Sequence, residues 1–260
     1  MSEEEQPSRD WRWYGKRLLF IIGAGCTLLF LFVFIRIILG APDIDALRTS
    51  FAKTKMSKSA QRDALQVVEC ISSNSVSWGA IAPVIGRFRV PVPGWMVFRF
   101  RRRLAVVDYS RSSKSTRMWI FDTSSGELLK SAPVRHGDGK GAQSKSYVTA
   151  FSNKPGSQLS SLGVLMGTFP AIGGLKKKWP SKKILLLEGQ EKGWNDNVRT
   201  REIVVHSTNY QYSDGCLSTP IQNLSSFISN LALGGFIYAH YPSAKYKKES
   251  TFLNCGAKSR

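Results

Sequence analysis

The longest apolar stretch of the chain lies near its start. Residues 18–35 carry no charge, and the apolar pattern continues past Arg36 to residue 39. About 20 apolar residues span the hydrocarbon core of a bilayer as a helix, whereas the apolar core of a cleaved signal is about 7–15 residues long. We therefore predict a transmembrane helix over residues 18–39, with Cys26 as an ordinary residue of that helix.

Basic residues flank the predicted membrane helix on both sides. Those before it are Arg9, Arg12, Lys16 and Arg17. The positive-inside rule then keeps residues 1–17 in the cytoplasm as a short tail and sends the rest of the chain across the membrane. Arg36 and Arg48, which follow the apolar stretch, reduce this charge asymmetry.

The next segment, residues 40–100, has a mixed pattern. Apolar residues recur at helical spacing between residues 43 and 73, as at Ala64, Leu65, Val68 and Ile71, which predicts one or two short amphipathic helices. Prolines follow at 83, 91 and 93, and proline interrupts helices. We predict a helical stalk and a proline-containing linker over residues 40–100.

Beyond residue 100 the pattern changes to short runs rich in branched apolar residues, separated by Ser- and Gly-rich turns. The runs are residues 104–109, 117–122, 128–134, 161–167, 184–188, 203–206 and 235–239. One helix is expected at residues 221–231. Short strands joined by turns favour a mainly β sandwich or barrel over a βαβ sheet. We assign residues 101–245 to this domain and residues 246–260 to a basic C-terminal tail.

Charge and cysteine content restrict the possible partners. The chain has 37 Lys and Arg against 18 Asp and Glu, a net charge of +19, so a polyanion or an anionic surface is expected to attract it. No zinc-finger, RRM or basic-zipper pattern is present, which argues against nucleic acid and leaves anionic wall polymers or lipid headgroups. A basic patch at residues 176–183, around Trp179, could contact such a polymer or be a solvated loop. Four cysteines without a CxxC pair predict no metal site, and no cofactor is expected.

One cysteine and one histidine form a candidate catalytic pair. His206 ends a β-branched run, and Cys216 follows in the turn Ser213-Asp214-Gly215-Cys216. A cysteine nucleophile needs a base or a cation because a free thiol is only slightly ionised at neutral pH. Gly215 would permit a tight turn whose amides bind an oxyanion. The spacing alone also fits a structural histidine and a half-buried cysteine.

Several short blocks in a fixed order give this pair its context. They are residues 106–110, Arg117 with Phe121-Asp122, residues 134–137, residues 151–153 with Gly156-Ser157, residues 160–163, residues 191–197, residues 203–206 and residues 213–216. In this order the segment from 104 to 238 resembles the murein L,D-transpeptidase catalytic domain family of the YkuD type, in the branch with upstream His-Gly and Phe-Ser-Asn blocks. The resemblance implies a YkuD-like β-sandwich or barrel with one or two short helices.

The resemblance also implies a reaction. Cys216 would attack the penultimate peptide bond of a peptidoglycan stem tetrapeptide, and an amine acceptor would resolve the acyl-enzyme. His206 would be the base, oriented by the backbone carbonyl of Ser207. The amides of Gly215 and Cys216, with that of Asp214, would bind the oxyanion. Plain L,D-carboxypeptidase hydrolysis and a non-catalytic peptidoglycan-binding module remain alternatives.

The site departs from the family pattern. Tyr212, Asp214 and Leu217 stand where arginine, tryptophan or histidine, and proline are usual, and the loop before Cys216 is short. A carboxylate at Asp214 would tend to raise the pKa of a neighbouring thiol. Candidate substrate-binding residues are His136, Ser213, Asn197, Arg199 and Arg201. His136 could equally cap a turn, Asn197 could form an Asx turn, and the arginines could be solvated.

These features together predict a compartment. The chain is expected in the inner (cytoplasmic) membrane of a bacterium as a single-pass protein, with its catalytic domain on the periplasmic or extracellular side. Cys70 and Cys255 remain once Cys26 and Cys216 are assigned. They could pair as a disulfide if the domain lies in that oxidising compartment.

Overall fold

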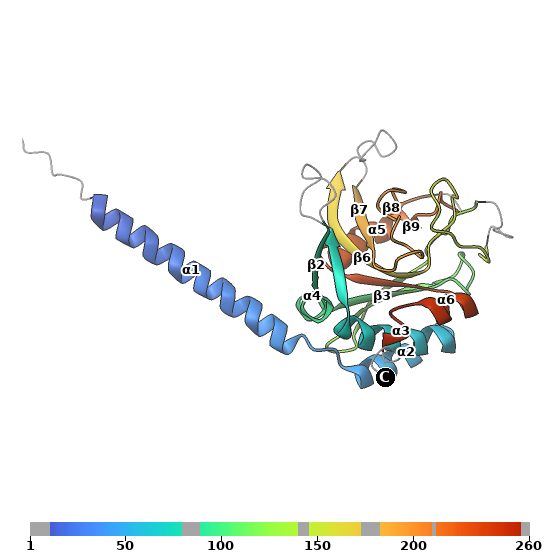
Figure 1. The fold of residues 1–260 in the computed structure, drawn as a ribbon, viewed down its shortest axis with the longest axis horizontal. Coiled ribbons are helices and arrows are strands. Elements are labelled where there is room, and N and C mark those ends of the chain that lie inside the picture. The colour runs from blue at the N-terminus through green and yellow to red at the C-terminus, as the bar shows by residue number, and fades with distance from the viewer. Residues whose placement is uncertain (1–10, 80–88, 140–145, 173–182, 210–211, 256–260) are drawn as a thin grey trace, which may run out of the picture.

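The computed structural model describes residues 11–79, 89–139, 146–172, 183–209 and 212–255. A long helix, α1 (Trp11–Leu39), projects from a domain formed by the rest of the chain (Figure 1). Its segment Lys16–Ile35 has a mean hydropathy of 2.8 and is long and apolar enough to cross a membrane. The predicted apolar helix is therefore present. Most of residues 1–17 and of the basic patch around Trp179 lie outside the described residues.

An eight-stranded sheet forms the centre of the domain, in the order β5-β4-β3-β10-β6-β7-β8-β9. Its strands are β3 (Arg103–Asp108), β4 (Met118–Asp122), β5 (Leu128–Ala132), β6 (Gly163–Ile172), β7 (Lys183–Gly189), β8 (Val204–Ser207), β9 (Leu217–Thr219) and β10 (Phe236–His240). Seven of them coincide with the predicted runs, and the mainly β fold is confirmed. Strands such as β4 and β10 are buried at every position, as expected where both faces of a sheet are covered.

Helices from both ends of the chain pack on this sheet. α2 (Ile44–Ala52) and α3 (Lys58–Ser73) begin at the N-caps Asp43 and Ser57, whose side chains accept amide hydrogen bonds that the first helical turn leaves open. Phe51 packs edge-on against Phe121 of β4, with ring centroids 4.7 Å apart. α3 contacts β3 and β10, and α5 (Ile221–Leu231) contacts β6, β7 and β8. The segment predicted as a stalk thus contributes to the same core as the sheet.

Two further elements lie in the segment predicted as a linker. β1 (Ser75–Gly79) and β2 (Arg89–Pro93) form a separate antiparallel pair, and α4 (Gly94–Arg101) starts directly after Pro93. A proline just before a helix does not interrupt it, because the first helical turn needs no donor there. Gly94 packs so tightly on α3 that a Cβ would lie 2.2 Å from the carbonyl oxygen of Ile71.

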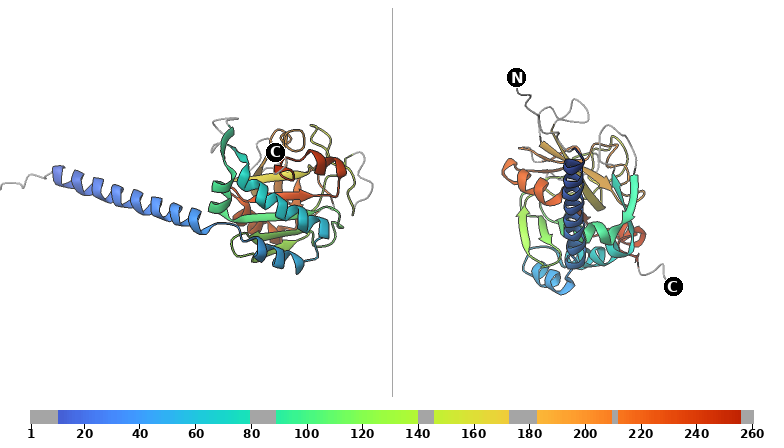
Figure 2. Two further views of the ribbon diagram at one scale, coloured as in Figure 1. Left: turned by 60° about the horizontal axis from the view of Figure 1, so that its bottom comes forward. Right: turned by 90° about the vertical axis from the view of Figure 1, so that its left-hand side faces the viewer.

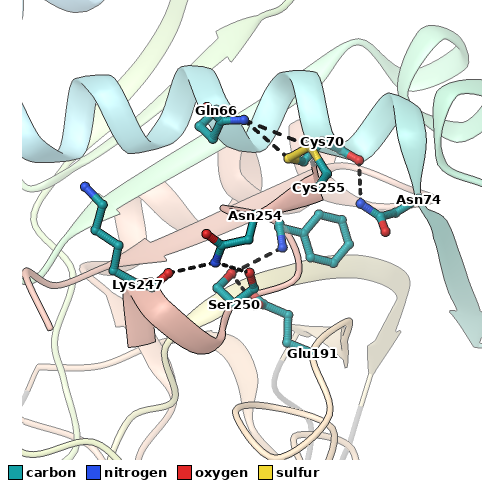
Figure 3. The surroundings of a disulfide bond; sticks show 9 residues. Gln66, Cys70, Asn74, Glu191, Lys247, Ser250, Asn254 and Cys255 are labelled. Atoms are coloured by element: carbon teal, nitrogen blue, oxygen red, sulfur yellow. Dashed lines mark hydrogen bonds between the residues drawn. A yellow bond between two sulfur atoms is a disulfide. The ribbon is translucent and has the colours of Figure 1, made fainter. Parts of the chain in front are cut away.

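The end of the chain is also part of the domain. α6 (Ala244–Glu249) buries Tyr246, and Phe252 is buried after it. Cys70 of α3 forms a disulfide with Cys255 (Figure 3). The pairing considered from the sequence is therefore present, and the predicted tail is anchored as far as Cys255. The basic composition of this segment favours a solvated tail. Its packing depends on contacts with α3 and with Glu191, which lie far away in the sequence.

A buried histidine on β10, His240, connects the central sheet with α3. The ring of His240 lies 3.1 Å from Ser59 Oγ and 3.3 Å from Tyr238 Oη, and its Nδ1 is 3.6 Å from the Asp63 carboxylate. Burial lowers the pKa of His240, while the carboxylates of Asp108 and Asp63 act in the opposite direction. The remaining charged groups that act on the ring are Lys247 and Arg62.

This histidine predicts a pH-dependent stability. Because the folded-state pKa is below the unfolded value of about 6.5, the unfolded chain takes up a proton first as the pH falls. The free energy of unfolding should therefore decrease from pH 7 toward pH 5, with a slope of at most about 1.4 kcal/mol per pH unit. Urea unfolding of the chain in detergent micelles measures this, and subtracting the curve of a His240→Gln variant isolates the contribution of His240. Parallel curves for the two proteins would contradict it.

Candidate functional site

The predicted nucleophile and base lie on neighbouring strands. β8 and β9 are parallel, with Val205 level with Leu217 and His206 level with Ser218. Cys216 comes directly before β9, so it is level with Val204, two residues before His206. Side chains two residues apart on a strand point to the same face. This register therefore places Cys216 and His206 on the same face of the sheet, and their exposed fractions are 2% and 6%.

The imidazole of His206 has a defined orientation. Its Nδ1 lies 2.7 Å from the backbone carbonyl oxygen of Ser207. A carbonyl can only accept, so Nδ1 carries the proton and Nε2 is the basic nitrogen of the neutral ring. This contact matches the arrangement expected for Ser207, and it orients the ring without a buried carboxylate.

The thiol of Cys216 is influenced by an acceptor and by a cation. Its Sγ donates to the carbonyl oxygen of Glu202 over 3.6 Å, a contact that favours the protonated form. Burial lowers the pKa of Arg201, and the negative charge of a Cys216 thiolate opposes that shift. The Arg201 guanidinium therefore stabilises the thiolate once it forms.

Arg201 also fixes the loop that borders the cysteine. Its Nη1 donates to Ser152 O at 2.6 Å and Ser161 Oγ at 2.8 Å, and its Nη2 donates to Ser157 Oγ at 3.2 Å and Leu159 O at 2.5 Å. With these four bonds the guanidinium holds the segment 152–161 beneath the cysteine turn. The candidate substrate-binding arginine thus sits beside the thiol and makes structural contacts there.

The turn before Cys216 is stabilised by a hydrogen bond within the turn and by one to the segment of His136. Ser213 Oγ donates to Cys216 O at 2.7 Å, and the Ser213 amide donates to His136 O at 2.8 Å. Gly215 has φ = +104°, a conformation that favours glycine. Asp214 is exposed at the tip of the turn, where water screens its charge. Its carboxylate therefore acts on the thiol less than its position in the sequence indicates.

A buried arginine supports the turn through His136. Arg117 Nη2 lies 2.9 Å from His136 Nδ1 and Nε donates to Val134 O at 2.7 Å, and its guanidinium stacks 5.0 Å from the centre of the Tyr109 ring. Burial lowers the pKa of Arg117 to about 10, so it remains charged at neutral pH. Because Arg117 can only donate, His136 Nδ1 accepts and the ring is neutral. His136 is fully buried.

Gly137 lies directly beneath the turn. A Cβ on this residue would be 2.0 Å from Gln158 O and 2.8 Å from the Gly215 amide nitrogen. The Gly137 amide donates to Ser160 Oγ at 3.0 Å, and that hydroxyl donates to Gly215 O at 3.3 Å. Glycine is therefore required here because two backbone segments approach closely.

Gly137→Ala is expected to disturb both the fold and the site. The added methyl group forces Gln158 and Gly215 apart, at a cost of about 1–3 kcal/mol in the free energy of unfolding, and misplaces the amides beside Cys216. Urea unfolding and the rate of Cys216 alkylation by iodoacetamide measure the two effects. Gly25→Ala in α1 is the control, since a Cβ at Gly25 meets nothing within 4 Å and alanine is favoured in a helix. Equal effects of the two substitutions would contradict the argument.

Two other candidate residues, Asn197 and Arg199, precede the pair in the sequence. The Asn197 amide and its Nδ2 bond to Asn153 at 3.1 Å each, which joins the segments before β6 and β8. Arg199 Nε lies 3.6 Å from Glu188 of β7, and its Nη2 donates to Thr168 of β6 at 3.4 Å. The structure brings Arg201, Ser213 and, through its carbonyl, His136 to the cysteine turn.

Sequence reasoning missed the supporting roles of Arg117, Gly137, Ser160 and Tyr109. Arg117 did carry a signal, because a single charge that opens an otherwise apolar strand is rarely buried without hydrogen-bond partners. The other three lie in the ordered blocks, but nothing in the sequence indicated these roles, since their contacts join segments that are distant in the sequence. Within the described residues, no group of three or more His, Cys, Asp or Glu side chains could hold a metal ion.

A comparison with known proteins shows the family of the chain. A model of the L,D-transpeptidase catalytic domain family matches residues 98–240, more than half of the chain. The chain belongs to this family. The matched segment contains Cys216, His206 and the residues beneath them. A comparison with curated proteins found no match.

Solved L,D-transpeptidase structures resemble the chain only distantly. The enzyme from Stackebrandtia nassauensis is 11% identical with a TM-score of 0.34, and the match covers 70% of this chain and 68% of that one. The enzyme from Mycobacterium smegmatis is 12% identical with a TM-score of 0.32, over 54% and 59%. The helical cell shape determining protein Pgp2 from Campylobacter jejuni is 10% identical with a TM-score of 0.37, over 76% and 62%. The chain thus spans about three fifths to two thirds of these relatives.

Proposed function

We propose that this L,D-transpeptidase family member forms an acyl-enzyme on Cys216 with the stem tetrapeptide of peptidoglycan and passes it to an amine. The observation that carries the proposal is the 2.7 Å contact between His206 Nδ1 and the Ser207 carbonyl, one strand away from Cys216. A histidine held in this tautomer presents Nε2 as a base on the face of the sheet where the thiol lies.

The reaction follows from these positions. His206 Nε2 takes the proton of Sγ, and the thiolate, stabilised by Arg201, attacks the carbonyl carbon of the penultimate residue of the tetrapeptide, in the bond to its last residue. The amides of Gly215 and Cys216, with that of Asp214, donate to the resulting oxyanion. The intermediate collapses to a thioester, and the leaving amine takes the proton from His206. An acceptor amine then attacks the thioester and regenerates the thiol.

The candidate substrate-binding residues divide into two groups in this proposal. His136, Ser213 and Arg201 position the cysteine turn, and a contact with the substrate is secondary for them. Asn197 and Arg199 recognise groups on the stem peptide from the edge of the site. The shortened loop before Cys216 leaves fewer loop contacts to the substrate than relatives with a longer loop have.

We further propose that α1 anchors the chain in the cytoplasmic membrane of a bacterium, with the domain on the periplasmic or extracellular side. The disulfide between Cys70 and Cys255 supports this side, since disulfides persist in oxidising compartments. The basic residues before α1 support it through the positive-inside rule. Peptidoglycan stem peptides are found on that side, where the basic surface can also meet anionic wall polymers.

Mass spectrometry of the purified full chain tests the proposal. After incubation with a carbapenem or with tetrapeptide muropeptides, the chain should gain the mass of one acyl group on the peptide that contains Cys216, and a Cys216→Ala variant should gain none. Products then separate the acceptors, because a dimeric muropeptide reports an amine acceptor and a tripeptide reports water. An unmodified Cys216 and unchanged muropeptides would refute the catalytic function and favour a wall-binding module.

A further inference from the structure

The outward face of α4 has an unusual composition. Gly94, Val97 and Phe98 are buried in the domain. Trp95, Met96 and Phe100 on the opposite side are 38%, 39% and 36% exposed. A surface helix of a globular domain normally turns polar side chains outward. Here the eight residues include no acidic side chain, and the outward face carries three large apolar ones.

The polar residues of α4 add positive charge to this face. Arg99 lies one turn after Trp95, with its guanidinium 5.9 Å from the centre of the indole ring. Arg101 points away from this face, since its Nη2 donates to the carbonyl oxygens of Ser229 and Asn230 in α5 at 3.1 Å each. A face of tryptophan, phenylalanine, methionine and arginine combines an apolar surface with a cation, which suits the boundary between lipid tails and anionic headgroups.

The position of α4 points to the same partner. α1 and α4 are in contact, and both views of the domain place α4 on the side from which α1 departs (Figures 1 and 2). The apolar face remains exposed with α1 present. The loop that carries Leu233, which is 41% exposed, adjoins the helix, because a Cβ on Gly234 would lie 2.7 Å from Val97 Cγ1. This loop extends the apolar surface.

We propose that the face formed by Trp95, Met96, Arg99 and Phe100 inserts into the outer boundary of the bilayer that α1 crosses, and binds anionic lipid headgroups there. The inference rests on the proposed membrane anchorage of α1. Insertion of α4 would fix the domain against the membrane by two contacts, α1 and α4, and would hold it in one orientation. β8 and β9, which position His206 and Cys216, form one edge of the sheet, and three strands separate them from β3, the strand that follows α4.

Fluorescence quenching by brominated lipid tests this inference. The full chain is placed in nanodiscs of phosphatidylcholine and phosphatidylglycerol whose acyl chains carry bromine near the headgroup, and tryptophan emission is compared with that in unbrominated nanodiscs. Trp95→Phe should remove part of the quenching. The control is Trp194→Phe, which changes an indole packed against Tyr246 and Lys245 in the domain. It should leave unchanged the loss of emission that bromine causes.

Three outcomes would overturn the inference. Equal quenching in the native chain and in Trp95→Phe means that the face does not touch lipid. A second copy covering the face would give two chains per particle in light scattering, together with loss of that second copy on Phe100→Ser. If the face binds a wall peptide and not lipid, the emission of Trp95 would change only when muropeptides are added. Carbapenem acylation of Cys216, measured on the same nanodiscs, tests the catalytic function separately. A failed membrane contact and a failed catalytic function can therefore be distinguished.

Discussion

His206→Ala is expected to lower the rate of Cys216 acylation by about 100-fold to 10,000-fold, the usual contribution of a positioned general base. The thiol donates to a carbonyl in the resting structure, so the reactive thiolate forms only when a base removes the proton. Loss of the imidazole leaves hydroxide and water for that step. The rate of carbapenem adduct formation, followed by mass spectrometry between pH 6 and pH 9.5, measures the effect.

The matched control is the neighbouring residue. The contact that orients His206 is made by the backbone carbonyl of Ser207, which Ser207→Ala preserves. This variant should therefore react within about threefold of the native rate. The defect of His206→Ala should shrink as the pH rises, because hydroxide then supplies the thiolate. A defect of the same size in both variants, or one that does not vary with pH, would mean that His206 is only a structural residue.

Much of the sheet was predictable because its signal is local. β3, β4 and β10 are short apolar runs bounded by turn residues, and burial on both faces makes such runs continuous. The α5 helix was predictable in the same way, from apolar residues at helical spacing. β9 was missed because three residues carry no periodicity, although this strand positions Cys216 beside β8.

The boundaries of the domain depend on long-range packing. The apolar stripe of α3 fits both a free-standing amphipathic helix and one packed on a sheet, and only the sheet in the folded chain decides between them. The same holds for Ser250, whose buried hydroxyl donates to Glu191, 59 residues earlier. The sequence could still indicate Cys70 and Cys255 as a pair, since exclusion of the other two cysteines left only these.

The candidate site also has a part that the sequence predicts and a part that depends on long-range packing. Cys216 and His206 were predictable from an ordered set of blocks, and the histidine's carbonyl contact lies within two residues of sequence. The supports beneath them were not, because Arg117 meets His136 across 19 residues and Gly137 meets Gly215 across 78. Close backbone approach leaves no mark in the sequence except a glycine, and glycines also mark ordinary turns.

Removal of the disulfide is expected to have the largest effect on stability. Cys70 and Cys255 are 185 residues apart, and a cross-link over so long a segment greatly restricts the unfolded chain. A chain with Cys70→Ala and Cys255→Ala should therefore lose about 2–5 kcal/mol in the free energy of unfolding. Urea unfolding in detergent micelles, followed by tryptophan fluorescence, measures the loss. Cys26→Ser is the control, since Cys26 is an exposed free thiol on α1.

The contacts of the C-terminal segment make this loss larger than the effect on the unfolded chain alone. Ser250 Oγ and Tyr246 Oη donate to the buried Glu191 carboxylate at 2.6 Å and 2.7 Å, and burial raises the pKa of that carboxyl. If the segment detaches, Glu191 loses these two donors and the amide of Thr251, and it retains the amide of Val164 at the start of β6. A reductant should therefore destabilise the native chain and leave the double variant unchanged. Equal urea midpoints of the native chain with and without reductant would show that these packing contacts hold the segment without the disulfide.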